Sequence, residues 1–165
     1  MEEDDETSNV VPPWVELEYA HMRTLAGANS KIYFTHLSLN ETTTSGSQVE
    51  SAEAFCITSG VLDLIKEKLG GSLNRVCLLD PKAEKELSPE DGDGRFDWFL
   101  FGVRDDPPRD RTGELRVIGF PGRHLGPTQM TTDTALGVTK LVVHDKVPLD
   151  EISYIVSTPL YWRCI

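Results

Sequence analysis

Apolar residues recur at three- and four-residue steps in two long stretches of the chain, which is the spacing of one face of a helix. The first stretch predicts a helix over residues 12–26, because two prolines suit its start and a glycine follows its end. The second predicts a helix over residues 50–69, closed by a Gly-Gly pair.

A third helix is predicted near residue 131. Thr131 or Thr132 caps it, Asp133 lies in its first turn, and it stops before Pro148. Four apolar side chains of this helix are predicted to be buried, namely Ala135, Val138, Leu141 and Val142.

Short apolar runs between turn residues predict strands over residues 32–34, 75–79, 97–102 and 152–156. Strands that alternate with helices indicate an α/β fold with a mainly parallel sheet and flanking helices. In such a sheet, ligands bind at the carboxyl ends of the strands.

Two polar segments are expected near that edge of the sheet. Residues 103–112, VRDDPPRDRT, are too charged for the core and predict an exposed loop, with a short helix from Pro108 or Arg109 to Leu115. Residues 119–129 are rich in glycine and proline and predict either a wandering loop or a backbone cradle for a ligand.

The sequence predicts no metal site. Residues 80–95 contain EDGDG, but the twelfth position of a calcium loop would lack its glutamate, so we predict a plain turn there. The four histidines lack the paired spacing of metal ligands. Neither a GxGxxG nor a P-loop motif occurs, so neither type of nucleotide site is supported.

The chain has 165 residues and a net charge of −11. This charge opposes broad binding to nucleic-acid phosphates and favours basic partners. Three widely spaced cysteines fit a reducing compartment. The acidic start and the lack of a long apolar run predict a cytoplasmic protein without membrane association.

Three segments in a fixed order are more specific than the composition, namely RVCLLDP at 75–81, DPPRDRTGELR at 106–116 and GFPGRHLGPTQMTTDTA at 119–135. With PPWVELEYAHM at 12–22, they resemble the SPOUT-class S-adenosylmethionine-dependent methyltransferases. Within that class they resemble the group typified by a fungal protein-arginine methyltransferase that modifies a small-subunit ribosomal protein, a group also described as RNA methyltransferases.

The resemblance implies a SPOUT-type fold with a deep trefoil knot, S-adenosylmethionine as cofactor, and a monomer. It also implies that the glycine-rich segment holds the cofactor through close-approaching backbone groups. The predicted cofactor-binding residues are Gly102, Arg123, Leu125, Gly126, Gln129, Met130, Thr131 and Asp133.

The implied reaction is methyl transfer to an arginine of a basic ribosomal protein. A guanidinium stays protonated near neutral pH, so the reaction needs a carboxylate to fix it and to take its charge as a proton leaves. The candidate carboxylates are Asp105, Asp106, Asp110 and Glu114 around the loop and Glu16 and Glu18 on the first helix. From these we select Asp106, Asp110 and Glu18 as catalytic candidates. Solvated surface charge is the alternative for each of them.

Two other functions stay open. RNA methylation is supported by a local basic patch, although the net charge opposes it; the patch comprises Arg104, Arg109, Arg111 and Arg116. A catalytically inactive acidic module that masks a basic protein surface is the other alternative.

The chain departs from the family pattern at both ends, where an initial apolar strand and a longer carboxyl-terminal segment are expected. The loop after the third strand also has fewer glycines than the family shows, which bears on cofactor affinity. We therefore expect an acidic disordered end over residues 1–11, one SPOUT-like domain over 12–156 and a divergent tail over 157–165. The fold is expected to be incomplete at both termini.

Overall fold

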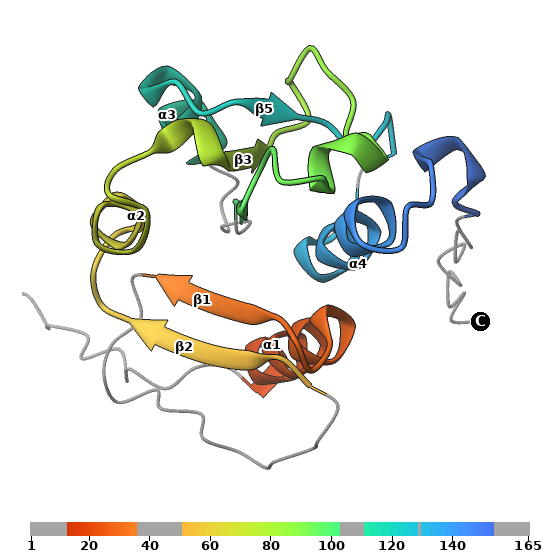
Figure 1. Ribbon diagram of the computed structural model, residues 1–165. Coiled ribbons are helices and arrows are strands. Elements are labelled where there is room, and N and C mark those ends of the chain that lie inside the picture. Colours follow the sequence, from red (N-terminus) through yellow and green to blue (C-terminus); the bar gives the residue numbers. More distant parts are fainter. Residues whose placement is uncertain (1–12, 36–50, 103–110, 129, 154–165) are drawn as a thin grey trace, which may run out of the picture.

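The computed structural model describes residues 13–35, 51–102, 111–128 and 130–153 (Figure 1). Among these residues the helices are α1 (Pro13–Ala26), α2 (Val61–Leu69), α3 (Arg111–Ile118) and α4 (Thr132–Val143). The strands are β1 (Lys31–Thr35), β2 (Glu53–Ile57), β3 (Val76–Leu79), β4 (Trp98–Phe101) and β5 (Gly122–Arg123). Three 3-10 turns complete the described elements, namely η1 (Leu73–Arg75), η2 (Pro89–Gly92) and η3 (Leu149–Glu151).

All strand pairs of the described chain are parallel, which confirms the predicted sheet type. One sheet has the order β4-β3-β5, and the other pairs β1 with β2. Figure 1 shows the two sheets in separate layers, with α2 at one end between them and α1 beside α4 at the other. Tyr33 of β1 stacks on Trp98 of β4, with ring centroids 5.1 Å apart, and so connects the two layers.

The central strand β3 is buried on both faces because its side chains alternate between two apolar clusters. Cys77 and Leu79 pack in one cluster with Val138 and Val142 of α4. Val76 and Leu78 pack in the other, which includes Ile65 of α2. Burying a side chain of this size stabilises the fold by about 1.5–3 kcal/mol, so β3 is the main anchor of the three-stranded sheet.

The predicted helix over residues 50–69 is wrong in its first half. Residues Glu53–Ile57 form β2, which pairs with β1 in register Tyr33↔Phe55, and only Val61–Leu69 is helical. The two parts meet at the Thr-Ser-Gly sequence before Val61. Apolar spacing alone does not separate a strand from a helix over these residues. Phe and Ile favour strands, and pairing with β1 makes Glu53–Ile57 a strand.

The other predicted helices are confirmed with smaller corrections. In α4, Val138 and Val142 are buried as predicted, whereas Ala135 is half-buried and Leu141 is exposed. Helix α3 ends at Ile118 rather than at Leu115, and its predicted start before Arg111 lies outside the described residues.

The predicted last strand, residues 152–156, is not supported where the structure describes it. The turn η3 precedes it. Ile152 has an extended backbone, but neither Ile152 nor Ser153 belongs to a sheet of the described residues, and an extended segment is a strand only when it pairs with another. The remainder, residues 154–156, lies outside the described residues, as do residues 1–11 and 157–165.

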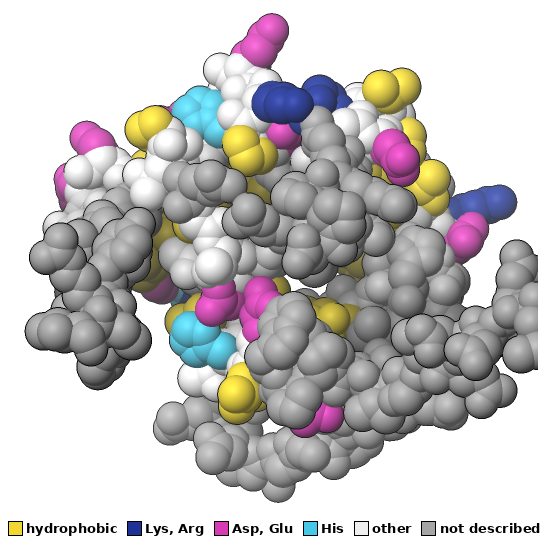
Figure 2. Space-filling view, turned by 180° about the vertical axis from the view of Figure 1, so that it is seen from behind, with side chains coloured by type: hydrophobic (Ala, Val, Ile, Leu, Met, Phe, Trp, Pro, Cys, Tyr) yellow, Lys and Arg dark blue, Asp and Glu magenta, His cyan; other side chains and the backbone are white. Residues whose placement is uncertain are grey.

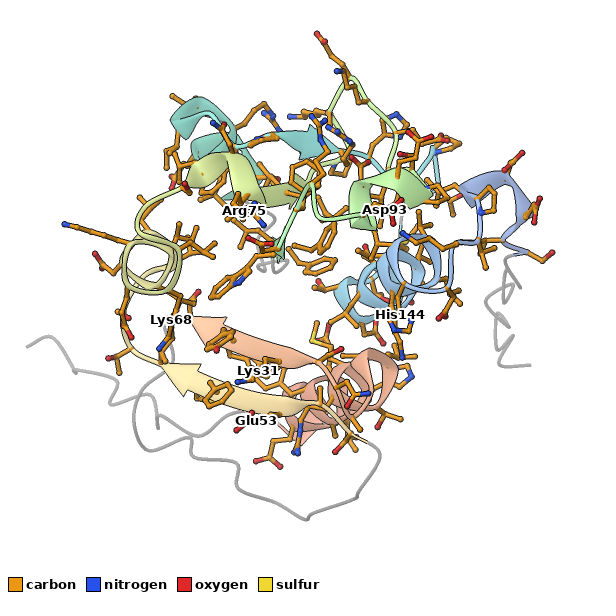
Figure 3. All side chains as sticks on the ribbon, viewed as in Figure 1. Lys31, Glu53, Lys68, Arg75, Asp93 and His144 are labelled. Atoms are coloured by element: carbon orange, nitrogen blue, oxygen red, sulfur yellow. The ribbon has the colours of Figure 1, made fainter. Side chains whose placement is uncertain are left out.

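Ion pairs on the surface contribute little to the stability of this fold. Lys31 and Glu53 extend from neighbouring strands with Nζ 3.8 Å from a carboxylate oxygen, and both side chains are exposed (Figure 3). Exposed pairs of this type contribute between zero and about 1 kcal/mol. No helix of the described part of the chain is long and apolar enough to cross a bilayer.

Candidate functional site

The candidate site lies where three parallel strands end. Strands β3, β4 and β5 run in the same direction, so the segments that follow Leu79, Phe101 and Arg123 leave the sheet at one edge. Gly102 follows β4 directly, and a Cβ added to it would meet Thr112 of α3 at 3.4 Å. The segment between them, which contains the predicted Asp106 and Asp110, lies outside the described residues.

The glycine-rich segment is built around a strand that sequence reasoning missed. Gly122 and Arg123 form β5 and pair with Leu78 and Leu79 of β3. A Cβ on Gly122 would lie 3.1 Å from Cβ of Ala83, so this glycine permits close packing of the neighbouring segment. A strand of two residues gives too little pattern for a periodicity argument to detect.

The side chain of Arg123 binds other groups of the protein. Its Nε and Nη2 each donate to a carboxylate oxygen of Asp91 at 2.9 Å, and Nη1 donates to the carbonyl of Gly122 at 2.8 Å. The guanidinium also lies 5.2 Å from the ring centroid of Phe96. Arg123 is 6% exposed, so its guanidinium is buried and bound to Asp91.

The residues after β5 form the cradle proper, which we define as Leu125–Thr131. Gly126 has φ +82, the left-handed conformation that glycine adopts readily, and no atom lies within 4 Å of a Cβ added to it. Its amide donates to Nδ1 of His124 at 3.1 Å. Leu125 and Met130 are half-buried and pack on the core cluster of β3 and α4, so both ends of the cradle are anchored. Gln129 lies outside the described residues.

The cradle ends at the first turn of α4, where Asp133 accepts three hydrogen bonds. Oδ1 accepts from the Thr131 hydroxyl and, at 2.8 Å, from the Thr134 amide, while Oδ2 lies 2.8 Å from Nδ1 of His21. Burial raises the pKa of Asp133, but these hydrogen bonds outweigh burial and hold the pKa below its usual value. Asp133 is therefore ionised at neutral pH and is bound to neighbouring protein groups.

Glu18 lies near this carboxylate because α1 packs against α4. Partial burial raises the pKa of Glu18, and the charge of Asp133 raises it further. In the view from behind, acidic side chains gather beside a histidine near the middle of the face (Figure 2). The structure thus brings together two predicted site residues, Glu18 and Asp133, that are far apart in the sequence.

Sequence reasoning missed His21, the residue that connects these two helices. It lies three positions after Glu18, so both side chains share one face of α1. The sequence shows this spacing, but it does not show that α4 lies beside α1 and brings Asp133 within reach of His21.

Asp80 is a second missed residue at this sheet edge. It follows β3 directly, is 2% exposed, and binds Arg116 of α3, with Nη2 2.9 Å from Oδ1. This pair fixes α3 to the end of β3. Because the Arg116 guanidinium is bound to Asp80, its charge is neutralised and it contributes less to the predicted basic patch. Arg104, Arg109 and the side chain of Arg111 lie outside the described residues.

Within the described ranges, no three His, Cys, Asp or Glu side chains form a group that could hold a metal ion. Asp91 and Asp93 of the EDGDG sequence instead face Arg123 and Lys146. The carboxylates of this turn are thus engaged with cations of the protein.

A family model described as "Protein arginine N-methyltransferase SFM1-like" matches residues 1–162. The chain belongs to this family. Over 158 residues it is 39% identical to protein arginine N-methyltransferase SFM1 of Saccharomyces cerevisiae, covering 86% of this chain and 70% of the yeast protein.

Solved structures agree with this membership. The yeast arginine methyltransferase SFM1 complexed with SAM superposes with a TM-score of 0.67 and 36% identity, covering 87% of this chain and 67% of that one. A dual-specific Trm10 protein of Thermococcus kodakaraensis has a TM-score of 0.53 at 18% identity, covering 84% of this chain and 91% of that one. This second likeness shows the fold alone, and both agree with the SPOUT-type fold class that the resemblance implied.

Proposed function

We propose that this chain transfers a methyl group from S-adenosylmethionine to the guanidinium of an arginine in a basic protein. The observation that carries the proposal is its 39% identity to a yeast protein arginine N-methyltransferase. Structures of that yeast enzyme are complexed with SAM, SAH and MTA, which supports S-adenosylmethionine as the cofactor.

The cradle is the proposed cofactor site. A sulfonium cofactor supplies an activated methyl group, so the protein has to bind it, orient it and exclude water. Backbone N–H and C=O groups suit recognition of an adenine and a ribose, and the left-handed turn at Gly126 turns the backbone at the middle of the cradle. The proposed cofactor residues are Gly102, Leu125, Gly126, Gln129, Met130 and Thr131. Arg123 and Asp133 enter as supports, because their side chains are bound within the protein.

Glu18 is the proposed carboxylate for the substrate guanidinium, and Asp106 and Asp110 are proposed to assist it. A carboxylate binds the planar guanidinium through paired hydrogen bonds and can accept the proton that methylation releases. The raised pKa of Glu18 makes it a better proton acceptor than an ordinary exposed glutamate. Its place beside Asp133 sets it next to the end of the cradle.

A ribosomal protein is the proposed substrate class. Such proteins carry many Lys and Arg side chains, and a net charge of −11 attracts them over a distance of about one Debye length, roughly 8 Å at physiological salt. We propose that the reaction takes place in the cytoplasm and that the enzyme acts as a monomer, as the family resemblance implies.

RNA methylation is the second candidate, and it rests on the predicted basic patch of four arginines. The occupied guanidinium of Arg116 weakens it, because the predicted phosphate-binding patch loses one of its four arginines. An inactive acidic module is the third candidate, and it differs from both enzymes in transferring no methyl group.

The proposal is tested by titrating S-adenosylhomocysteine into the purified chain in a calorimeter and then by following labelled methyl groups. We expect saturable one-to-one binding and label in a basic ribosomal-protein fraction, with none in RNA. Label in RNA would favour the second candidate. Binding of the basic protein without any methyl transfer would favour the inactive module.

A further inference from the structure

His21 and Asp133 connect two helices across 112 positions of sequence. Nδ1 of His21, on α1, lies 2.8 Å from Oδ2 of Asp133 in the first turn of α4. The His21 side chain is 55% exposed and that of Asp133 is 19% exposed. Exposed pairs add little to the free energy of unfolding, so stability alone gives a weak reason for this contact.

The direction of the hydrogen bond follows from chemistry. Asp133 also accepts bonds from Thr131 and Thr134, and an ionised carboxylate has no proton to donate. His21 therefore donates through Nδ1–H. The bond is charge-assisted and stronger than one between neutral groups.

Thr131 connects the His21–Asp133 pair to the cradle. Thr131 is the last residue of the cradle and the N-cap position of α4, and its hydroxyl donates to Asp133 rather than capping the helix. His21 thus holds Asp133, which in turn holds Thr131. Moving α1 would shift the end of the cradle.

Glu18 occupies a different electrostatic position on the same helix face. The Asp133 carboxylate has three donors, whereas the Glu18 carboxylate has no hydrogen-bond or ion-pair partner among the described residues. Two neighbouring carboxylates repel each other, and a cation placed against the second one relieves that repulsion. A substrate guanidinium is such a cation.

We propose that His21 is a positioning residue: by holding Asp133, it fixes the end of the cofactor cradle against α1 and keeps Glu18 beside it. This inference rests on the proposed function, since it assigns a cofactor to the cradle. It separates two roles on one helix, with His21 acting on the cofactor site and Glu18 on the substrate.

The test compares His21→Leu, His21→Asn and the control His144→Leu by S-adenosylhomocysteine calorimetry on the full chain. His144 is a good control because it also pairs with an aspartate, Asp145 at 2.7 Å, but lies at the opposite end of α4 (Figure 3). Thermal unfolding of each variant, measured alongside, reports any general loss of structure.

We expect His21→Leu to weaken the affinity about tenfold, the size of one lost hydrogen bond to a charged group. His21→Asn can place an amide N–H near the position of Nδ1 and should recover affinity to within about threefold. His144→Leu should bind like the wild type. Equal binding by wild type and His21→Leu would overturn the positioning role.

A double variant tests whether His21 acts through Asp133. The His21→Leu, Asp133→Asn chain should bind no more weakly than Asp133→Asn alone, because both changes remove the same contact. Additive losses would overturn the proposal. A wild-type chain that binds no S-adenosylhomocysteine would instead overturn the proposed function, so the two failures are distinguishable.

Discussion

Arg123 and Asp91 form a buried two-pronged ion pair, with both nitrogen–oxygen distances at 2.9 Å. The pair joins β5, the strand that leads into the cradle, to η2, and the Phe96 ring lies against the guanidinium. Asp91 also accepts a hydrogen bond from the Ser88 amide at 3.1 Å. The position of the cradle thus depends on a charged contact in the interior.

Replacing Asp91 with Asn should destabilise the chain by about 3–5 kcal/mol, because it leaves the Arg123 guanidinium buried without its counter-charge. Urea unfolding followed by circular dichroism measures this change. The control is Asp93→Asn, which removes the exposed partner of Lys146 and should leave the unfolding midpoint nearly unchanged. Equal midpoints for the two variants would contradict the account.

The same pair predicts a dependence of stability on acid. Burial raises the pKa of Asp91, but hydrogen bonds from Arg123 and Ser88 outweigh it and lower the pKa below the ordinary value. The unfolded chain therefore binds the proton first, so stability from the pair is complete above about pH 3.9 and is lost as pH falls through the lowered folded pKa. Urea unfolding between about pH 5 and 2.5 should show a steeper slope for wild type than for Asp91→Asn. Parallel slopes would exclude this contribution.

Gly126 and Gly94 provide a matched test of the cradle. Their φ angles are +82 and +83, and neither has an atom within 4 Å of an added Cβ. Alanine at either position should cost about 1–2 kcal/mol of stability through the left-handed backbone alone. Only Gly126→Ala should also weaken S-adenosylhomocysteine binding, which calorimetry measures. An equal loss of affinity in Gly94→Ala would show that general destabilisation is the cause.

Glu18→Gln should lower kcat/KM for the protein substrate by about 100-fold or more, because the amide neither accepts the proton nor carries the charge that binds guanidinium. Affinity for S-adenosylhomocysteine should stay within about twofold, since Glu18 is assigned to the substrate. The control is Glu16→Gln, an exposed residue of the same helix. A variant Glu18→Gln with wild-type turnover would remove Glu18 from the mechanism.

Cys77 and Cys56 should differ in reactivity. Cys77 is fully buried in β3, and burial raises its thiol pKa to about 12, so the reactive thiolate is scarce at neutral pH. Cys56 of β2 is partly exposed. Mass spectrometry after brief N-ethylmaleimide treatment near pH 7.5 should find Cys56 modified before Cys77. The reverse order would contradict the placement of β3 at the centre of the core.

Two strands of the central sheet could be predicted from sequence, because the RVCLL and WFLF runs are each recognisable without reference to the rest of the chain. Apolar residues of this kind between turns are typical of buried parallel strands, and β3 and β4 lie where they were expected. The division of residues 50–69 into β2 and α2 could not be predicted, since it depends on pairing with β1, a long-range contact.

The candidate site, like the fold, could be predicted only in part from the sequence. The family motif located the cradle, the start of α4 and Asp133, whereas His21 and the pairs Asp80–Arg116 and Asp91–Arg123 required three-dimensional placement. Partners separated by 30 residues or more leave no periodic trace in the sequence. The sequence thus identified the segments that we propose to bind the cofactor, but not the side-chain contacts that hold these segments in place.

The most direct test of the central claim is mass spectrometry of arginine residues in a ribosomal-protein fraction incubated with the chain and isotopically labelled S-adenosylmethionine. We expect a labelled methyl group on an arginine side chain, lost in Glu18→Gln and retained in Glu16→Gln. Saturable S-adenosylhomocysteine binding with no labelled arginine, or label found in RNA instead, would contradict it.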